Sequence, residues 1–138
     1  MPWAILDTNV YIGAWTRGEF DAVLTTLRQS FVVRHSAVVL SELRRGVRSA
    51  DAERRLQALV RQVGRAWAPT TDDWWEAGGL IRRIGDQQSW SRERRRTFQN
   101  DALIALTARR HGATVVTSNR QDFRLLRQYL RFSLIEAA

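Results

Sequence analysis

The sequence predicts an α/β fold in which a short, mainly parallel β-sheet carries helices on both faces. Short apolar or β-branched runs that suit strands alternate with longer segments of helical periodicity. The size of the chain agrees, because 138 residues with 44% hydrophobic content are enough for an ordinary core. We therefore expect residues 1–138 to form a single domain.

Strands are expected where short apolar or β-branched runs stand between polar segments. They fall at residues 3–6, 31–34, 114–117 and 131–135. The first strand is followed directly by Asp7, Thr8 and Asn9, which are residue types that form turns or cap helices. Strands that alternate with helices in this way pair in parallel.

Helices are expected where apolar residues recur at helical spacing between capping residues. They fall at residues 37–47, 51–63, 72–84, 99–111 and 122–129. Ser36 and Thr71 are the caps of the first and third of these, and Gly112 closes the fourth. The polar and basic segment 89–96 is either a loop or the start of a helix.

The charge of the chain points to a polyanionic partner. All 22 basic residues are arginine, against 14 acidic residues, which leaves a net charge of +8. Codon bias accounts for arginine in place of lysine but not for the excess. Because arginine binds phosphate with two hydrogen bonds, nucleic acid is the leading partner and an acidic protein the second.

Several classes of site and location are excluded by composition. Without lysine the chain has no P-loop, protein-kinase site or Schiff base, and it has no G-x-G-x-x-G motif. Without cysteine it has no disulfide or thiolate metal site. No apolar run approaches a membrane span, and the N-terminus does not resemble a signal peptide. We expect a cytoplasmic protein without membrane contact.

Five polar residues are expected near one edge of the sheet, where parallel strands end and ligands bind. Asp7 follows the first strand, and Asn119 and Asp122 follow the third. Asp101 lies in the first turn of the helix that leads into the third strand, so it faces the same edge. Glu42 is expected near this edge but deeper in the molecule.

Each of these acids has an ordinary explanation when taken singly. Asp7 and Asp122 are capping types, Asp101 complements a helix dipole, and Glu42 can be solvated beside Arg45. Asp101 and Glu42, however, share helix faces with apolar residues, which costs free energy unless the carboxylate is paired or binds a metal. A divalent cation such as Mg²⁺ or Mn²⁺ would relieve the repulsion. Together the residues indicate metal-assisted hydrolysis of phosphodiesters.

Four short segments resemble, in order and spacing, those of PIN-domain nucleases. They are residues 5–9 (I-L-D-T-N), 41–46 (S-E-L-R-R-G), 100–105 (N-D-A-L-I-A) and 117–123 (T-S-N-R-Q-D-F). Over essentially its whole length the chain resembles the VapC-type toxins of bacterial type II toxin–antitoxin systems. The resemblance implies a Rossmann-like three-layer α/β/α fold and Mg²⁺- or Mn²⁺-dependent endoribonuclease activity. It also implies a VapB-like antitoxin as partner and a homodimer.

The resemblance assigns roles to individual residues. Asp7, Glu42 and Asp101 match the three acidic positions, and Asp7 and Asp101 are the expected metal ligands. Thr8 and Asn9 match a polar pair that shapes the first loop.

The fourth acidic position is open between two residues. Asn119 stands where many members have aspartate, and it offers an amide oxygen without charge. Asp122 is then the available carboxylate. Glu42, Asn119 and Asp122 are expected to reach the metal directly or through water, and the catalytic set is Asp7, Glu42, Asp101 and Asp122.

Other residues allow more than one interpretation. Four arginines before the Asp101 helix form either an RNA-backbone clamp or a solvated loop: Arg92, Arg94, Arg95 and Arg96. Four tryptophans suit the core, a dimer or antitoxin surface, or base stacking: Trp67, Trp74, Trp75 and Trp90. A structural role is expected for both histidines, His35 and His111.

Two other functions compete with the nuclease. Asn119 leaves open a catalytically weak, PIN-like module that binds nucleic acid without cutting it. An aspartyl phosphotransferase using Asp7 is a third reading, but such folds rely on a lysine, and Asn9 stands where their second aspartate is expected.

Overall fold

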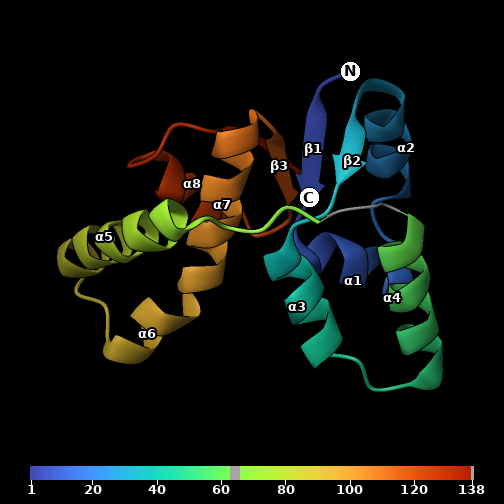
Figure 1. Ribbon diagram of the computed structural model, residues 1–138, viewed down its shortest axis with the longest axis horizontal. Coiled ribbons are helices and arrows are strands. Elements are labelled where there is room, and N and C mark those ends of the chain that lie inside the picture. The colour runs from blue at the N-terminus through green and yellow to red at the C-terminus, as the bar shows by residue number, and fades with distance from the viewer. Residues whose placement is uncertain (63–65, 138) are drawn as a thin grey trace.

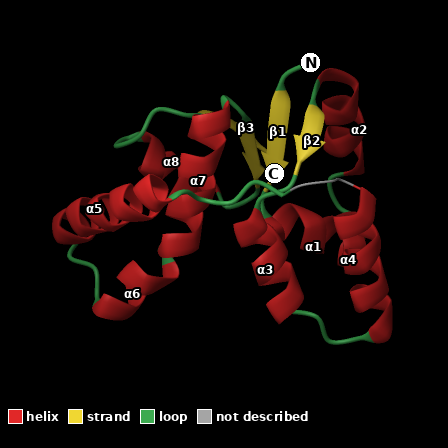
Figure 2. Ribbon diagram, in the orientation of Figure 1, coloured by secondary structure: helices red, strands yellow, loops and turns green. Residues whose placement is uncertain are grey.

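A computed structural model describes residues 1–62 and 66–137 (Figure 1). Its elements follow in the order β1 (Trp3–Leu6), α1 (Thr8–Arg17), α2 (Asp21–Ser30), β2 (Val32–Arg34), α3 (Ala37–Arg45), α4 (Ala50–Gln62), α5 (Thr71–Gln88), α6 (Arg92–Thr97), α7 (Gln99–His111), β3 (Thr114–Thr117), α8 (Arg120–Arg127) and β4 (Ser133–Glu136). Figure 2 shows helices around the strands and beyond one end of the sheet. No helix in the described part of the chain is long and apolar enough to cross a membrane.

The strands form one sheet in the order β2-β1-β3-β4, and every neighbouring pair is parallel. The central strands β1 and β3 are covered on both faces, and Ile5 and Val115 have no exposed surface. This burial explains why continuous apolar runs marked these strands. Helices α1 and α2 connect β1 to β2, and α7 and α8, which contact each other, flank β3 along the chain. Because crossovers between parallel strands are right-handed, the two pairs belong on opposite faces. The predicted α/β/α fold is therefore confirmed.

Helices α1 and α2 were not predicted from the sequence beyond a capping segment at residues 7–9. Helix α1 contains Gly13 among β-branched and aromatic residues, all of modest helix propensity. A Cβ on Gly13 would lie 2.5 Å from the ring of Phe20, so the glycine lets this ring pack on α1. Phe20 itself precedes α2 with a φ of 68° and no side-chain cap. Helix α1 has local signals at its ends, the Asp7 cap and Gly18 at a φ of 63°, whereas α2 depends on tertiary packing.

The remaining predictions differ from the structure mainly at element ends. Helix α5 begins after Thr70 rather than Thr71, because Thr70 and Asp73 form a capping box, and it continues to Gln88. Segment 89–96 does contain a helix, α6, whose N-cap is Ser91. Helix α7 and strands β1 and β3 have the predicted bounds.

Smaller shifts affect four further elements. Helix α3 ends two residues earlier than predicted, and strand β2 begins one residue later. Helix α8 starts earlier because Asn119 is its N-cap, and β4 is displaced toward the C-terminus. Helix α4 is described to Gln62, and the predicted end of this helix at Val63 lies outside the described residues.

The carboxyl ends of the strands lie where several helices meet. In Figure 1 the pairs α3–α4 and α5–α6 lie on opposite sides beyond the arrowheads of β1 and β2. Helix α7 packs against β1 and β3 with Leu103, Ile104 and Leu106 fully buried, so its N-terminal turn is fixed at this end. The fold therefore brings segments far apart in sequence to one edge.

Candidate active site

Asp7 lies directly after β1 and forms the N-cap of α1. Its carboxylate accepts hydrogen bonds from the Thr8 backbone N–H (2.8 Å), the Asn9 amide (3.0 Å) and the Thr117 hydroxyl (2.8 Å). The residue is 3% exposed. Burial raises the pKa of Asp7 in spite of these neutral donors, and the charge of Glu42 raises it further.

Asp101 lies in the first turn of α7, and the seven residues after it are all buried. The side-chain amide of Asn119, 3.4 Å away, is its hydrogen-bond partner. Burial, followed by the charges of Asp7 and Asp122, raises the pKa of Asp101 to about 8. The structure thus brings these carboxylates into one cluster, as their positions along the chain predict. Their catalytic roles stay a prediction.

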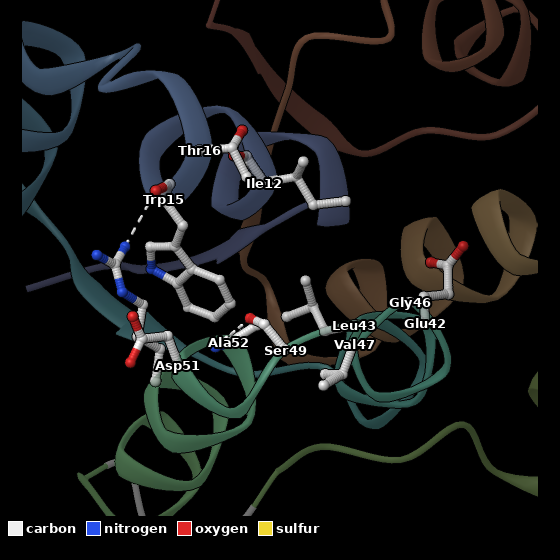
Figure 3. A pocket seen from close by; sticks show the side chains of 11 residues that line it. Ile12, Trp15, Thr16, Glu42, Leu43, Gly46, Val47, Ser49, Asp51 and Ala52 are labelled. Atoms are coloured by element: carbon white, nitrogen blue, oxygen red, sulfur yellow. Dashed lines mark hydrogen bonds between the residues drawn. The ribbon is translucent and has the colours of Figure 1, made fainter.

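Glu42 on α3 joins the cluster through Thr8, whose hydroxyl donates to Glu42 Oε1 at 2.8 Å. Figure 3 shows Glu42 at the edge of a largely apolar pocket of about 330 Å³, with its carboxylate pointing away from Trp15 and Leu43. Glu42 is half-buried whereas Asp7 is buried, so the expectation that Glu42 lies deeper is wrong. No salt bridge to Arg45 is present within the described residues.

Asn119 and Asp122 occupy the start of α8, next to Asp101. The Asn119 amide donates to Asp122 Oδ2 at 3.2 Å and to Asp101 Oδ2 at 3.4 Å. Arg94 donates to the other Asp122 oxygen at 2.6 Å. Both candidates for the fourth acidic position are therefore in the cluster. Asn119 bonds to two carboxylates, whereas Asp122 is also bonded to the Arg94 guanidinium.

The four arginines that were grouped as one possible clamp separate in the structure. Arg94 turns inward to Asp122, and Arg95 bonds to Asp86 and to the backbone oxygen of Trp90. The other two, Arg92 and Arg96, are exposed. Two of these guanidinium groups are thus bound within the protein, and contact of the four arginines with RNA stays a prediction.

Two residues shape the cluster from strand β3 and the first turn of α1. Thr8 and Asn9 lie in the first turn of α1 rather than in the expected loop. Asn9 accepts a hydrogen bond from the Ser118 backbone N–H at 3.0 Å, which ties this turn to the end of β3. Thr117, fully buried, donates to Asp7 and accepts from the Asn119 N–H at 2.9 Å. The sequence analysis did not single out Thr117. Its one local signal is a hydroxyl at the carboxyl end of strand β3, next to the segment of Asn119 and Asp122.

The donor set fits a hard divalent cation held partly by water. Mg²⁺ commonly takes one or two carboxylates and keeps several water ligands. Asp7 and Asp101 are two such carboxylates, and no salt bridge in the described ranges involves either. No group of three or more His, Asp or Glu side chains in these ranges is placed to hold a metal alone. A cation bound here would therefore keep water among its ligands.

The histidines and tryptophans lie outside the carboxylate cluster. His35 is buried with Nδ1 2.6 Å from the Tyr11 hydroxyl, and His111 stacks on Trp67 with ring centroids 3.9 Å apart. Trp74 and Trp75 are 50% and 86% exposed, so core packing does not explain this pair.

The family of the chain is shown by comparison with known proteins. The sequence pattern of the PIN domain family matches residues 4–128, which include every residue of the carboxylate cluster. This chain belongs to the PIN domain family. No curated protein is matched by direct sequence comparison.

Solved structures with the same fold come from VapBC complexes. VapBC-1 from nontypeable Haemophilus influenzae gives a TM-score of 0.72 at 17% identity, over 98% of both chains. VapBC2 from Rickettsia felis, bound to a DNA fragment of the promoter, gives 0.70 at 21%, over 97% of this chain and 98% of that one. VapBC-5 from Mycobacterium tuberculosis, a member of a toxin–antitoxin family, gives 0.60 at 20%, over 99% of both chains. These similarities establish the fold.

Proposed function

We propose that this chain is a Mg²⁺- or Mn²⁺-dependent endoribonuclease that acts as the toxin of a toxin–antitoxin pair. The observation that carries the proposal is the cluster of Asp7, Glu42 and Asp101 at the carboxyl edge of a PIN-domain sheet. In the described part of the chain, no arginine forms a salt bridge with any of the three. Acids left unpaired in this way either keep a proton or bind a cation from outside, and a divalent ion satisfies several of them at once.

Each residue of the cluster has a proposed task. Asp7 and Asp101 would hold the ion, and Glu42, Asn119 and Asp122 would reach it through water. When bound, the ion supplies Lewis acidity and lowers the pKa of a bound water for attack on the phosphodiester.

The orientation of Asp7 does not depend on the ion. Thr8, Asn9 and Thr117 each donate a hydrogen bond to its carboxylate. A carboxylate held at both oxygen atoms by rigid neighbours is preorganised for one binding geometry.

RNA is the proposed substrate because of charge and resemblance. A net charge of +8, all of it from arginine, attracts a polyphosphate backbone. The four motifs resemble those of VapC-type ribonucleases. A VapB-like antitoxin and a second copy of the chain are the proposed partners, supported by the fold shared with VapBC complexes.

Cleavage of structured RNA by the purified chain tests the proposal. Cutting should need Mg²⁺ or Mn²⁺ and stop with a chelator, and Asp7→Asn or Asp101→Asn should slow it by about 100-fold or more. Asp72→Asn, an exposed aspartate on α5, is the matched control and should cut normally. Undiminished cleavage by Asp101→Asn would contradict the site. RNA binding without cleavage would indicate the catalytically weak module instead.

A further inference from the structure

The Asp122 end of the acidic cluster is paired with a positively charged side chain, that of Arg94. Arg94 Nη2 lies 2.6 Å from Asp122 Oδ1, and the two side chains are 34% and 15% exposed. A pair so withdrawn from solvent is weakly screened by water and salt. By contrast, Asp7 and Asp101 have only neutral donors among the described hydrogen bonds. The cluster therefore has one neutralised end and one that is not.

Arg94 is held in place by aromatic rings as well as by charge. Its guanidinium carbon lies 4.4 Å from the Trp90 ring centre and 5.2 Å from that of Phe98. These residues come four positions before and four after Arg94, and Phe98 is fully buried. A guanidinium stacked on two rings and bonded to a carboxylate has little freedom to leave.

The hydrogen bonds continue from Arg94 to the metal-binding end of the cluster. Asp122 Oδ2 accepts from the Asn119 amide, and the same amide nitrogen lies 3.4 Å from Asp101 Oδ2. Because Asn119 carries no charge, the positive charge at this end comes from Arg94. Arg94 thus acts on Asp101 through Asp122 and Asn119 and is a positioning residue.

We infer that Arg94 takes the place of a second divalent cation, so that each chain binds one metal ion, at Asp7 and Asp101. This inference rests on the proposed function, which supplies the first ion. A second ion at Asp122 would have to displace a guanidinium that is already paired and stacked. The Asp122 corner is closed to metal while that guanidinium is in place.

Titration of the metal-free protein with Mn²⁺, followed by calorimetry, tests the inference. The wild type should bind one ion per chain. Arg94→Met removes the charge but keeps an apolar side chain against the rings, and it should bind two ions. Arg94→Lys keeps the charge and should restore a single ion. Arg92→Met, at an exposed position of the same helix α6, is the matched control and should also bind one.

The outcomes separate this inference from the proposed nuclease. Two ions per wild-type chain, or one ion in folded Arg94→Met, would overturn the role of Arg94 and leave the nuclease intact. One ion in the wild type and two in Arg94→Met, together with no RNA cleavage, would support Arg94 and contradict the nuclease. A wild type that binds no Mn²⁺ would overturn both. If Arg94→Met does not fold, Arg94→Gln replaces it as the variant without the charge and should bind two ions.

Discussion

Two buried aspartates, Asp73 and Asp7, have opposite surroundings in this fold, although they are 1% and 3% exposed. Burial alone would raise the pKa of Asp73, but hydrogen bonds from Arg110, at 2.6 and 3.1 Å, and from the Thr70 N–H outweigh it, and the pKa is lowered. Asp7 receives only neutral donors, and its pKa is raised. Two aspartates with similarly little exposed surface therefore have opposite charge preferences.

The opposite pKa shifts distinguish a carboxylate that is paired inside the protein from one that is free to bind a ligand. Asp73 caps α5 and ties it to α7 through Arg110, so its charge is satisfied inside the protein. Asp7 and Asp101 have no such partner in the described residues, and their charged forms cost free energy until a cation binds.

Removal of the Asp73 carboxylate should cause the largest loss of stability. Asp73→Ala breaks the capping box and removes the carboxylate that binds Arg110, at an expected cost of about 2 kcal/mol. Urea unfolding followed by tryptophan fluorescence measures this free energy. Asp72→Ala, one residue earlier and exposed, is the control and should stay within about 0.5 kcal/mol of wild type. A loss below about 1 kcal/mol for Asp73→Ala would contradict its structural role.

Substitution of Asp101 should raise the free energy of unfolding of the metal-free protein, whereas substitution of Asp73 lowers it. Above the ordinary pKa of 3.8 the unfolded chain releases a proton that the folded chain keeps, so wild-type stability should fall as the pH rises toward about 8. Asp101→Asn removes this decline and should be more stable than wild type by about 2 kcal/mol at the upper end. Chemical unfolding with chelator present, across this range, measures the difference. Equal pH profiles for the two proteins would contradict the assignment.

His35 extends the comparison to a buried base. Burial lowers the pKa of His35, and its Nε2 has no hydrogen-bond partner in the described structure. Below pH 6.5 the unfolded chain takes up a proton that the folded chain resists, so stability should drop by about 1 kcal/mol as the pH falls. Thermal unfolding across this range should show a smaller drop for His35→Gln. His111, whose pKa is also lowered, contributes with the same sign. An unchanged drop in His35→Gln would exclude His35 as its source.

The smallest effect is expected for a second ion pair between the same helices. Arg109 and Glu76 join α7 to α5 at 2.6 Å, as Arg110 and Asp73 do, but both side chains are about 40% exposed (41% and 42%). Water screens this pair, so Glu76→Gln should cost less than about 0.5 kcal/mol. The same urea unfolding assay measures it. A cost equal to that of Asp73→Ala would show that burial is not what separates the two pairs.

The sequence predicts those parts of the fold whose signals are local. Helix α7 is bounded by its apolar periodicity and by Gly112, which has a φ of 64° suited to glycine. Strands β1 and β3 are marked by continuous apolar runs. Helix α2 has no such signal, because Phe20 precedes it without a capping side chain and packs against Gly13. Helix α1 is bounded by Asp7 and by Gly18, at a φ of 63°, but its interior contains Gly13 and residues of modest helix propensity.

The candidate site shows the same limit. Topology places Asp7 and Asp101 at one edge of the sheet. Asp7 directly follows β1, and Asp101 lies at the start of α7, the helix that leads into β3. Periodicity does not show which of several neighbouring arginines turns inward. Phe98, four residues after Arg94, is one signal that distinguishes Arg94, because helical spacing brings the two side chains together. Trp90 precedes helix α6, so its contact with Arg94 is visible only in the structure. Thr117 depends on a contact across 110 positions, which no local pattern contains.

Metal-induced stabilisation of three proteins tests most directly whether the Asp7–Asp101 carboxylates await a divalent ion. Melting temperatures of the wild type, Asp101→Asn and Asp73→Ala are measured at about pH 8, with chelator and with saturating Mn²⁺. We predict that Mn²⁺ stabilises the wild type and Asp73→Ala alike, by about 2–3 kcal/mol at 100 times the dissociation constant, and leaves Asp101→Asn nearly unchanged. No shift in the wild type, or an equal shift in Asp101→Asn, would contradict the site.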